Sequence, residues 1–207
     1  MIIGLRVEAM FDTILLLTDY LVEQPFLSAW LLENNPGLTI ISVLTSAQIL
    51  DLDPDIFQRA RLIAFTASSI VPQAILAQLG YGAYNFHPGP PEYPGWRPGR
   101  FALVDGSTEF GVTVHSMAEE IDAGPIVKVS RFKIALGDSI ADIEERSYVH
   151  LLSLFRALSK VLATQAEPLS IIPIHWGRKK RRRNSRRTHS SGFFDLGKTN
   201  LRSAKHY

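Results

Sequence analysis

An amide and an imidazole lie two residues apart at the end of a short apolar segment. Residues 83–87 read Ala-Tyr-Asn-Phe-His, and alternate side chains of a strand point to the same face, so Asn85 and His87 would lie together while Phe86 points into the core. Both polar groups can donate hydrogen bonds to an oxygen atom that gains negative charge during a reaction. Alone, the pair also fits a structural role, since a histidine beside a proline-rich loop often serves only as a hydrogen-bonding group.

A carboxylate follows further along the chain, in Asp122-Ala123-Gly124-Pro125. One interpretation is a turn in which the aspartate bonds to its own backbone. A chemical interpretation is that Asp122 favours the charged form of His87 and accepts a proton from an amine, directly or through a water. A metal site made of His87, His115 and Asp122 is a third interpretation, because metals bind histidine and carboxylate. We expect no metal.

Short apolar segments alternate with helical patterns in the first half of the chain. We expect strands at residues 13–18, 38–44, 62–65 and 83–87, and helices at residues 25–33 and 71–79. This alternation predicts an α/β fold with a mostly parallel sheet flanked by helices on both faces. Ligands bind such sheets at the carboxyl ends of the strands, which is where Asn85 and His87 stand.

The second half of the chain adds a loop, a strand and a long helix. Residues 88–99 contain five prolines and three glycines, so we expect a stiff loop without regular structure. Residues 109–117 alternate apolar side chains with Gly111, Thr113 and His115, which predicts a strand with one polar face. Apolar residues at helical spacing predict a long amphipathic helix over residues 139–163 that closes the core.

Composition limits the class of protein. A chain of 207 residues with 46% hydrophobic side chains is long enough for one folded domain. The absence of cysteine excludes disulfides, cysteine nucleophiles and thiolate-bound metals, and it fits a reducing compartment. No apolar stretch approaches the roughly 18 residues that a membrane span needs, and the first residues lack the pattern of a cleaved signal peptide. We therefore expect a soluble cytoplasmic protein.

The possible catalytic residues occur within a longer pattern. Asn-x-His-Pro is followed by the proline- and glycine-rich loop and then by Phe-Gly-Val-Thr-Val-His-x-Met-x-x-x-x-Asp-x-Gly-Pro-Ile over residues 110–126. This pattern resembles the 10-formyltetrahydrofolate-dependent formyltransferase family, which includes methionyl-tRNA, glycinamide ribonucleotide and sugar N-formyltransferases as well as formyltetrahydrofolate hydrolases. The similarity extends over residues 62–127.

The resemblance implies a Rossmann-like fold and a folate-dependent enzyme of one-carbon metabolism. Asn85, His87 and Asp122 fall on the family's catalytic positions. A formyl group would move from 10-formyltetrahydrofolate to a primary amine through a tetrahedral intermediate, whose oxygen Asn85 and a protonated His87 would stabilise while Asp122 assists.

The resemblance also implies where the folate binds. Ser69, Ile70 and Val71 match the loop that holds the pterin ring through backbone contacts. Thr113 and His115 match residues that line the same pocket.

The loop after His87 departs from the family pattern. Most members continue with Ser-Leu-Leu-Pro, whereas this chain continues with Pro88-Gly89-Pro90-Pro91. Loops at this edge of a sheet decide which substrate fits, so the small-molecule amine acceptor stays unidentified. Trp96 and Arg97 are candidate acceptor contacts, through ring stacking and through binding of a phosphate or carboxylate.

The basic residues are concentrated at the end of the chain. Eleven of the 22 lysines and arginines, but only one of the 20 acidic residues, lie in residues 178–207. We therefore divide the chain into a catalytic domain, residues 1–176, and a basic tail, residues 177–207. The tail is either a solvated extension or a binder of phosphates on RNA or on a nucleotide-linked substrate.

Alternatives to the transferase remain open. A hydrolase ranks below a transferase because hydrolases of the family usually carry a regulatory domain before the first strand. A non-catalytic nucleic-acid-binding module would use the basic tail. The tRNA-directed members continue into a second, β-rich domain for which this sequence shows no pattern. The sequence indicates no membrane partner and leaves open a homo-oligomer and the role of residues 1–12.

Overall fold

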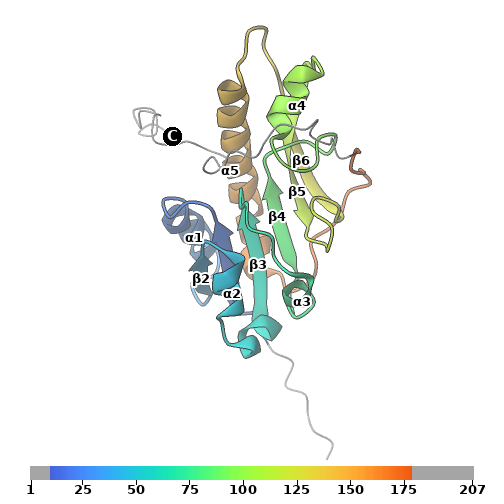
Figure 1. Ribbon diagram of the computed structural model, residues 1–207. Helices are drawn as coiled ribbons and strands as arrows, with labels where there is room; N and C mark the ends of the chain where they lie inside the picture. Colours follow the sequence, from blue (N-terminus) through green and yellow to red (C-terminus); the bar gives the residue numbers. More distant parts are fainter. Residues whose placement is uncertain (1–9, 179–207) are drawn as a thin grey trace, which may run out of the picture.

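Six strands form one sheet in the order β2-β1-β3-β4-β5-β6 (Figure 1). The computed structural model describes residues 10–178. Residues 1–9 and most of the basic tail, residues 179–207, lie outside the described residues. The expectations for the role of the first residues and for the tail fall largely there.

The sheet is mostly parallel, as the sequence predicted. β1 (Thr13–Thr18) pairs in parallel with β2 (Thr39–Val43) and with β3 (Ala60–Phe65), and β3 pairs in parallel with β4 (Ala83–His87). β5 (Glu109–Ser116) runs antiparallel to both β4 and β6 (Ile126–Lys133). β6 was not predicted from the sequence, because only Ile126 and Val127 of this edge strand are buried and its period-two pattern is weak.

Helices cover both faces of the sheet. α1 (Gln24–Leu32) and α5 (Ile140–Thr164) pack on one face, where Phe65, Phe86 and Phe155 lie at the centre of the larger hydrophobic core. α2 (Ser46–Leu50), the 3-10 helix η1 (Pro54–Arg59) and α3 (Gln73–Leu76) cover the opposite face. Phe86 points into the first core as predicted, so Asn85 and His87 face the other side of β4.

Two expectations about local structure were wrong. The helix expected over residues 71–79 is a single turn, α3, after which the chain brings Gly80 against the backbone of Gln58, where a Cβ atom would lie 2.0 Å from the carbonyl oxygen. The loop expected to run to residue 99 ends earlier, because Pro98 and Gly99 begin α4 (Pro98–Val104). Proline is well suited to the first helical turn, since its fixed φ fits there and no N–H is needed.

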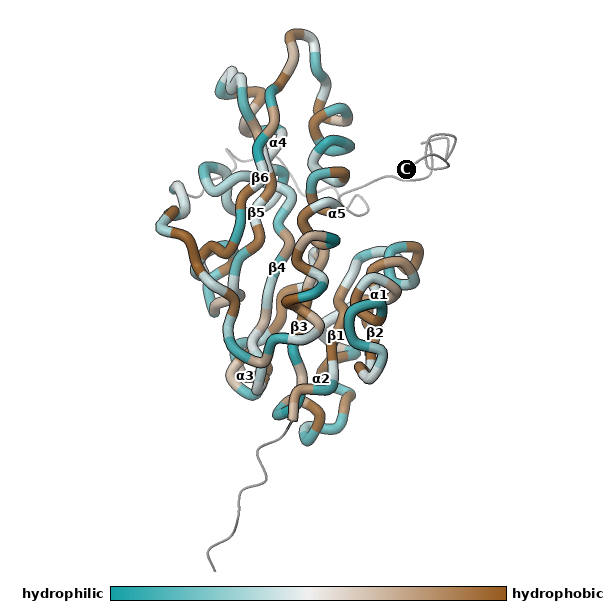
Figure 2. The backbone as a smooth tube through the Cα atoms, turned by 180° about the vertical axis from the view of Figure 1, so that it is seen from behind, coloured by the Kyte–Doolittle hydropathy of each residue, from teal (hydrophilic) through white to brown (hydrophobic). Residues whose placement is uncertain are grey.

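The long helix α5 is confirmed and carries both caps and core contacts. Ser139 and Asp142 form a capping box at its start, and buried residues such as Leu151 and Phe155 follow along one side. Figure 2 shows hydrophilic and hydrophobic residues alternating along this helix. Within residues 10–178, neither α5 nor any other helix has the length and apolarity required for a membrane span.

The chain returns to the sheet after α5. This return segment, residues 165–178, is drawn in orange and red in Figure 1 and runs along the β6 side of the sheet. The N–H of Leu169 donates to the hydroxyl of Tyr84, the N–H of Ile172 to the carbonyl of Ile126, and the N–H of Gly177 to the carbonyl of Pro91. The segment is therefore fixed to β4, to β6 and to the loop after β4.

Candidate active site

Two antiparallel strands bring the predicted polar residues together. In the register of β4 and β5, Asn85 pairs with His115 and His87 pairs with Thr113. Both strands alternate apolar and polar side chains, so the polar members of these pairs share one face of the sheet. Asp122 lies in the turn after β5 with φ +47, a left-handed conformation that aspartate tolerates better than most residues.

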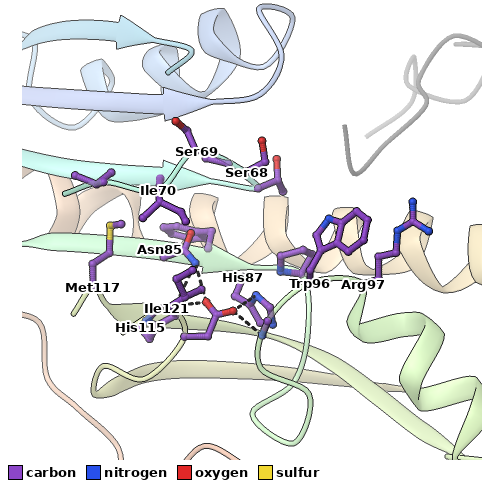
Figure 3. A pocket seen from close by; sticks show the side chains of 18 of the residues that line it. Ser68, Ser69, Ile70, Asn85, His87, Trp96, Arg97, His115, Met117 and Ile121 are labelled. Atoms are coloured by element: carbon purple, nitrogen blue, oxygen red, sulfur yellow. Dashed lines mark hydrogen bonds and ion pairs between the residues drawn. The ribbon is translucent and has the colours of Figure 1, made fainter. Parts of the chain in front are cut away.

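The carboxylate of Asp122 is the centre of the polar cluster. Its Oδ2 lies 3.4 Å from Nδ1 of His87, and its Oδ1 lies 3.3 Å from Nε2 of His115. The side-chain amide of Asn85 donates to Oδ1 at 3.4 Å and lies 3.1 Å from Nε2 of His115. The backbone N–H of Gly95 donates to Oδ2 at 2.8 Å. Figure 3 shows Asn85, His87 and His115 converging at this place.

Burial and charge act in opposite directions on the two central groups. Burial alone would raise the pKa of Asp122, but the charge of His87, the hydrogen bond and charge of His115 and the N–H of Gly95 hold that pKa well below its ordinary value. Asp122 therefore stays ionised. Burial lowers the pKa of His87, and although the charge of Asp122 and the carbonyl of Tyr93 oppose this, the net shift is downward. Asp122 thus favours the charged imidazole as expected, but burial outweighs its effect.

Both ring nitrogens of His87 face oxygen acceptors. Nδ1 faces Asp122, and Nε2 lies 3.2 Å from the carbonyl oxygen of Tyr93. A neutral imidazole carries one N–H, so only the charged ring can donate to both. The positions of the two acceptors therefore favour the charged imidazole, whereas the burial of His87, which is only 4% exposed, disfavours the charged form.

The loop after β4 is fixed in place beside the cluster. The hydroxyl of Tyr93 lies 3.1 Å from Asp105 and 2.6 Å from Ser107, which anchors the loop to the end of α4. A Cβ atom on Gly89 would lie 2.6 Å from Nε2 of His87, so the loop passes this close only because residue 89 is glycine. Thr113 donates its hydroxyl to the carbonyl of Gly89, is completely buried and does not line the cavity.

A cavity of about 900 Å³ lies on the same face of the sheet. Ser69, Ile70 and Val71 line one part of it, and Trp96 and Arg97 line another. In Figure 3, Asn85 and His87 lie between these two groups. The structure therefore brings together all the predicted site residues except Thr113, which supports the loop from behind.

The loop that precedes α3 is held by polar contacts from the residue after β1 and from the first residue of α2. Asp19, directly after β1, accepts hydrogen bonds from the backbone N–H and the hydroxyl of Ser68 at 2.8 and 3.1 Å. Ser69 accepts from the N–H of Ser46 at 2.8 Å and contacts its hydroxyl at 3.1 Å. Ile70 remains 62% exposed at the cavity. These contacts hold the loop in place, so its apolar side chains and backbone groups lie at fixed positions at the cavity.

Several cavity residues were not predicted from the sequence. Thr66 lines the cavity in a left-handed conformation with φ +50, which is rare for a β-branched residue, and nothing in its sequence signals this. Arg100 on α4 and Glu144 on α5 line the part that contains Arg97. The sequence could have indicated both residues, because Pro98 is typical of a helix start and Ser139 of a capping box, and both helices begin beside the site.

Within residues 10–178, no group of three or more histidine and acidic side chains has an arrangement suited to a metal ion. The structure therefore lends no support to the metal interpretation of His87, His115 and Asp122. Their distances of 3.3 and 3.4 Å are those of ion pairs between imidazole and carboxylate.

Comparison with known proteins identifies the sequence pattern. The family model described as formyl transferase matches residues 58–151. Methionyl-tRNA formyltransferase of Staphylococcus aureus (strain Newman) is 30% identical over 100 residues, which make up 48% of this chain and 30% of that protein. The chain thus matches less than a third of the length of this curated relative.

Solved structures share the fold. A sugar N-formyltransferase from Shewanella sp FDAARGOS_354 aligns with a TM-score of 0.68 and 18% identity, covering 82% of this chain and 76% of that one. A formyltransferase from Anoxybacillus kamchatkensis, in complex with UDP-4,6-dideoxy-4-formamido-L-AltNAc and tetrahydrofolate, aligns with a TM-score of 0.64 and 19% identity, covering 82% and 85%. Residues 58–151 of this chain therefore match the formyl transferase family model, and the α/β fold of the chain is the one found in sugar N-formyltransferases.

Proposed function

We propose that this protein transfers a formyl group from 10-formyltetrahydrofolate to the primary amine of a small-molecule acceptor. The observation that carries the proposal is the position of Asn85, His87 and Asp122 between two differently lined parts of one cavity. One part offers apolar side chains next to a backbone loop, and the other offers charged residues. A reaction between two bound molecules requires a site of this kind.

The apolar part fits the folate. Ile70, Val71, Met117 and Ile121 line it together with the loop fixed by Asp19. A flat heteroaromatic ring would pack between these side chains and would bond to backbone groups, as ligand pockets commonly arrange their contacts. When bound, the donor supplies a formyl group attached to nitrogen.

The charged part fits a polar acceptor. Arg97 and Arg100 line it together with Glu144, and the guanidinium of Arg97 lies 4.2 Å from the centre of the Trp96 ring. Arginine binds phosphate through several parallel hydrogen bonds, and a carboxylate attracts an amine. A nucleotide-linked amino sugar has both groups, and the solved structure from Anoxybacillus kamchatkensis holds a nucleotide-linked sugar with a 4-formamido group. We therefore propose an amino sugar as the first acceptor to test.

The cluster residues have distinct roles in this proposal. Asn85 and His87 donate hydrogen bonds to the formyl oxygen as negative charge develops on it, and Nε2 of His87 gives up its contact with the carbonyl of Tyr93 to do so. Asp122, which stays ionised, accepts the proton that the attacking amine must lose, directly or through a water. The bond between the formyl carbon and the donor nitrogen then breaks, and this nitrogen takes up a proton as tetrahydrofolate leaves. His115 and Gly95 hold the carboxylate in place through the contacts described above.

Substitution of the three residues tests the roles. Asn85→Ala, His87→Asn and Asp122→Asn should each lower turnover by about 100-fold or more, because each removes a group that acts in the transition state. His150→Asn is the matched control, since His150 on α5 bonds to Ser130 on β6 and lies outside the cavity lining. Folding is checked by circular dichroism, and donor binding by titration with 5-formyltetrahydrofolate. Turnover near wild type in all three variants would contradict the proposal.

A further inference from the structure

The return segment, residues 165–178, reaches the polar cluster from the side away from the cavity. Trp176 donates its indole N–H to the carbonyl of Gly124 at 2.7 Å. Its ring centre lies 4.9 Å from that of His115 at an interplanar angle of 87°, and 5.8 Å from that of His87 at 74°. Trp176 does not line the cavity. One side chain therefore contacts both imidazoles and the turn that carries Asp122.

We propose that Trp176 is a positioning residue for the formyl-transfer centre, an inference that rests on the proposed function of His87 and Asp122. It acts through contacts with His87, with His115 and with the turn that carries Asp122, and it lies beyond residues 58–151, the part matched by the family model. It contacts no reacting atom itself.

Trp176 packs against the two imidazole rings. The nitrogen atoms of His115 are held by Asn85, Asp122 and the carbonyl of Ser116, and those of His87 by Asp122 and the carbonyl of Tyr93. Such bonds lie in the ring plane and resist displacement within it, while rotation out of the plane is opposed only by packing. Edge-to-face contact with Trp176 supplies packing for both rings at once.

Trp176 also holds the turn after β5. Gly124 is packed so closely that a Cβ atom would lie 1.9 Å from the carbonyl oxygen of Ser116. The turn therefore has little conformational freedom of its own. The hydrogen bond from Trp176 to the carbonyl of Gly124 fixes its position relative to the rest of the cluster. Asp122 lies two residues earlier in a left-handed conformation. The position of the carboxylate and the orientation of the two rings thus depend on the same indole.

Trp176 also shields the polar cluster from water. His87, His115 and Asp122 are 4%, 2% and 6% exposed. Removing the indole would open the cluster from behind and let water screen the charges. Burial is the largest cause of the lowered pKa of His87, ahead of the opposing effect of Asp122 and the effect of His115. Loss of Trp176 should therefore move the pKa of His87 up, toward that of an exposed histidine.

Two substitutions at this position separate packing from hydrogen bonding. Trp176→Ala removes both, whereas Trp176→Phe keeps a ring and loses the N–H. Turnover should fall about 10- to 100-fold in the alanine variant and less in the phenylalanine variant, with the KM for the donor nearly unchanged because Trp176 does not line the cavity. Trp30→Phe is the control, since Trp30 packs against Phe26 and Phe155 and lies outside the cavity lining.

A titration gives a readout that does not depend on activity. The imidazole signals of His87 and His115 are followed by NMR against pH, assigned with His87→Asn and His115→Asn. A rise in the pKa of His87 in Trp176→Ala, with partial rescue in Trp176→Phe, supports the proposal. Unchanged turnover and unchanged titration in both variants would overturn it. Turnover near wild type in all three variants, Asn85→Ala, His87→Asn and Asp122→Asn, would instead overturn the proposed function, and the titration would still test the effect of Trp176 on the rings. If Trp176→Ala does not fold, the turnover and the His87 titration of Trp176→Phe test the proposal.

Discussion

The backbone N–H of Gly95 donates a 2.8 Å hydrogen bond to the carboxylate of Asp122. This bond joins the turn after β5 to the loop after β4, and both residues have positive φ, +95 for Gly95 and +47 for Asp122. The carboxylate therefore has two functions in the site. It carries the negative charge next to His87, and it ties together the two segments that flank the reaction centre.

Replacing Asp122 by asparagine should separate these two functions. Asparagine accepts the left-handed conformation and can still accept the N–H of Gly95, so the fold should persist. Asp122 raises the pKa of His87, and loss of the charge should lower that pKa further below its ordinary value. The measurement is an NMR titration of His87, and an unchanged or higher pKa would contradict the account.

Asp122→Ala provides a comparison for the backbone. Alanine is disfavoured in the left-handed region by roughly 1 to 2 kcal/mol. Its free energy of unfolding should therefore lie below that of Asp122→Asn by about this amount. Equal stabilities of the two variants would show that the left-handed conformation is not retained.

The buried Glu23 should make stability depend on pH. Burial raises its pKa from 4.5 to about 7, with a further contribution from Asp19, while Tyr148 and Thr66 act in the opposite direction. A raised pKa means that the folded state binds the proton more tightly than the unfolded state. The folded state therefore loses stability as the pH rises from 4.5 through about 7.

Glu23→Gln should abolish this loss, because glutamine stays uncharged. At the lower end of this pH range, Glu23→Gln should be as stable as wild type. Above the upper end, the free energy of unfolding of the variant should exceed that of wild type by roughly 3 kcal/mol. Urea unfolding of both proteins at several pH values measures the difference. A difference that shrinks as the pH rises would contradict the assignment.

The completely buried Arg61 holds the end of α5 to the sheet. Its guanidinium donates to the carbonyls of Leu162, Gln165 and Tyr81 at 2.7, 2.7 and 3.0 Å. Arg61→Met leaves these acceptors buried without a donor and should lower the free energy of unfolding by about 3 kcal/mol. Arg59→Met is the control, because Arg59 is exposed and forms only a surface pair with Asp12. Its cost should stay under about 1 kcal/mol. Equal effects of the two substitutions would contradict this role.

Local patterns predicted the parts of the fold and the site that depend on neighbours in sequence. Period-two alternation placed Asn85 and His87 on one face of β4, and helical spacing predicted α5. Contacts between distant segments could not be predicted in this way. Trp176 meets His115 only because the chain returns along β6, and Glu23 is buried although its charge predicts exposure. The left-handed conformation of Thr66 likewise depends on how β3 ends beside β4.

The most direct test of the account is the reaction itself. Purified protein is mixed with 10-formyltetrahydrofolate and a panel of amines, comprising nucleotide-linked amino sugars, glycinamide ribonucleotide, amino acids and charged tRNA, and release of tetrahydrofolate is followed by absorbance. The account predicts release that requires an amine and is strongest with a small-molecule acceptor. Release at the same rate without any amine would identify a hydrolase and contradict transfer, and the absence of both release and folate binding would contradict the proposed activity altogether.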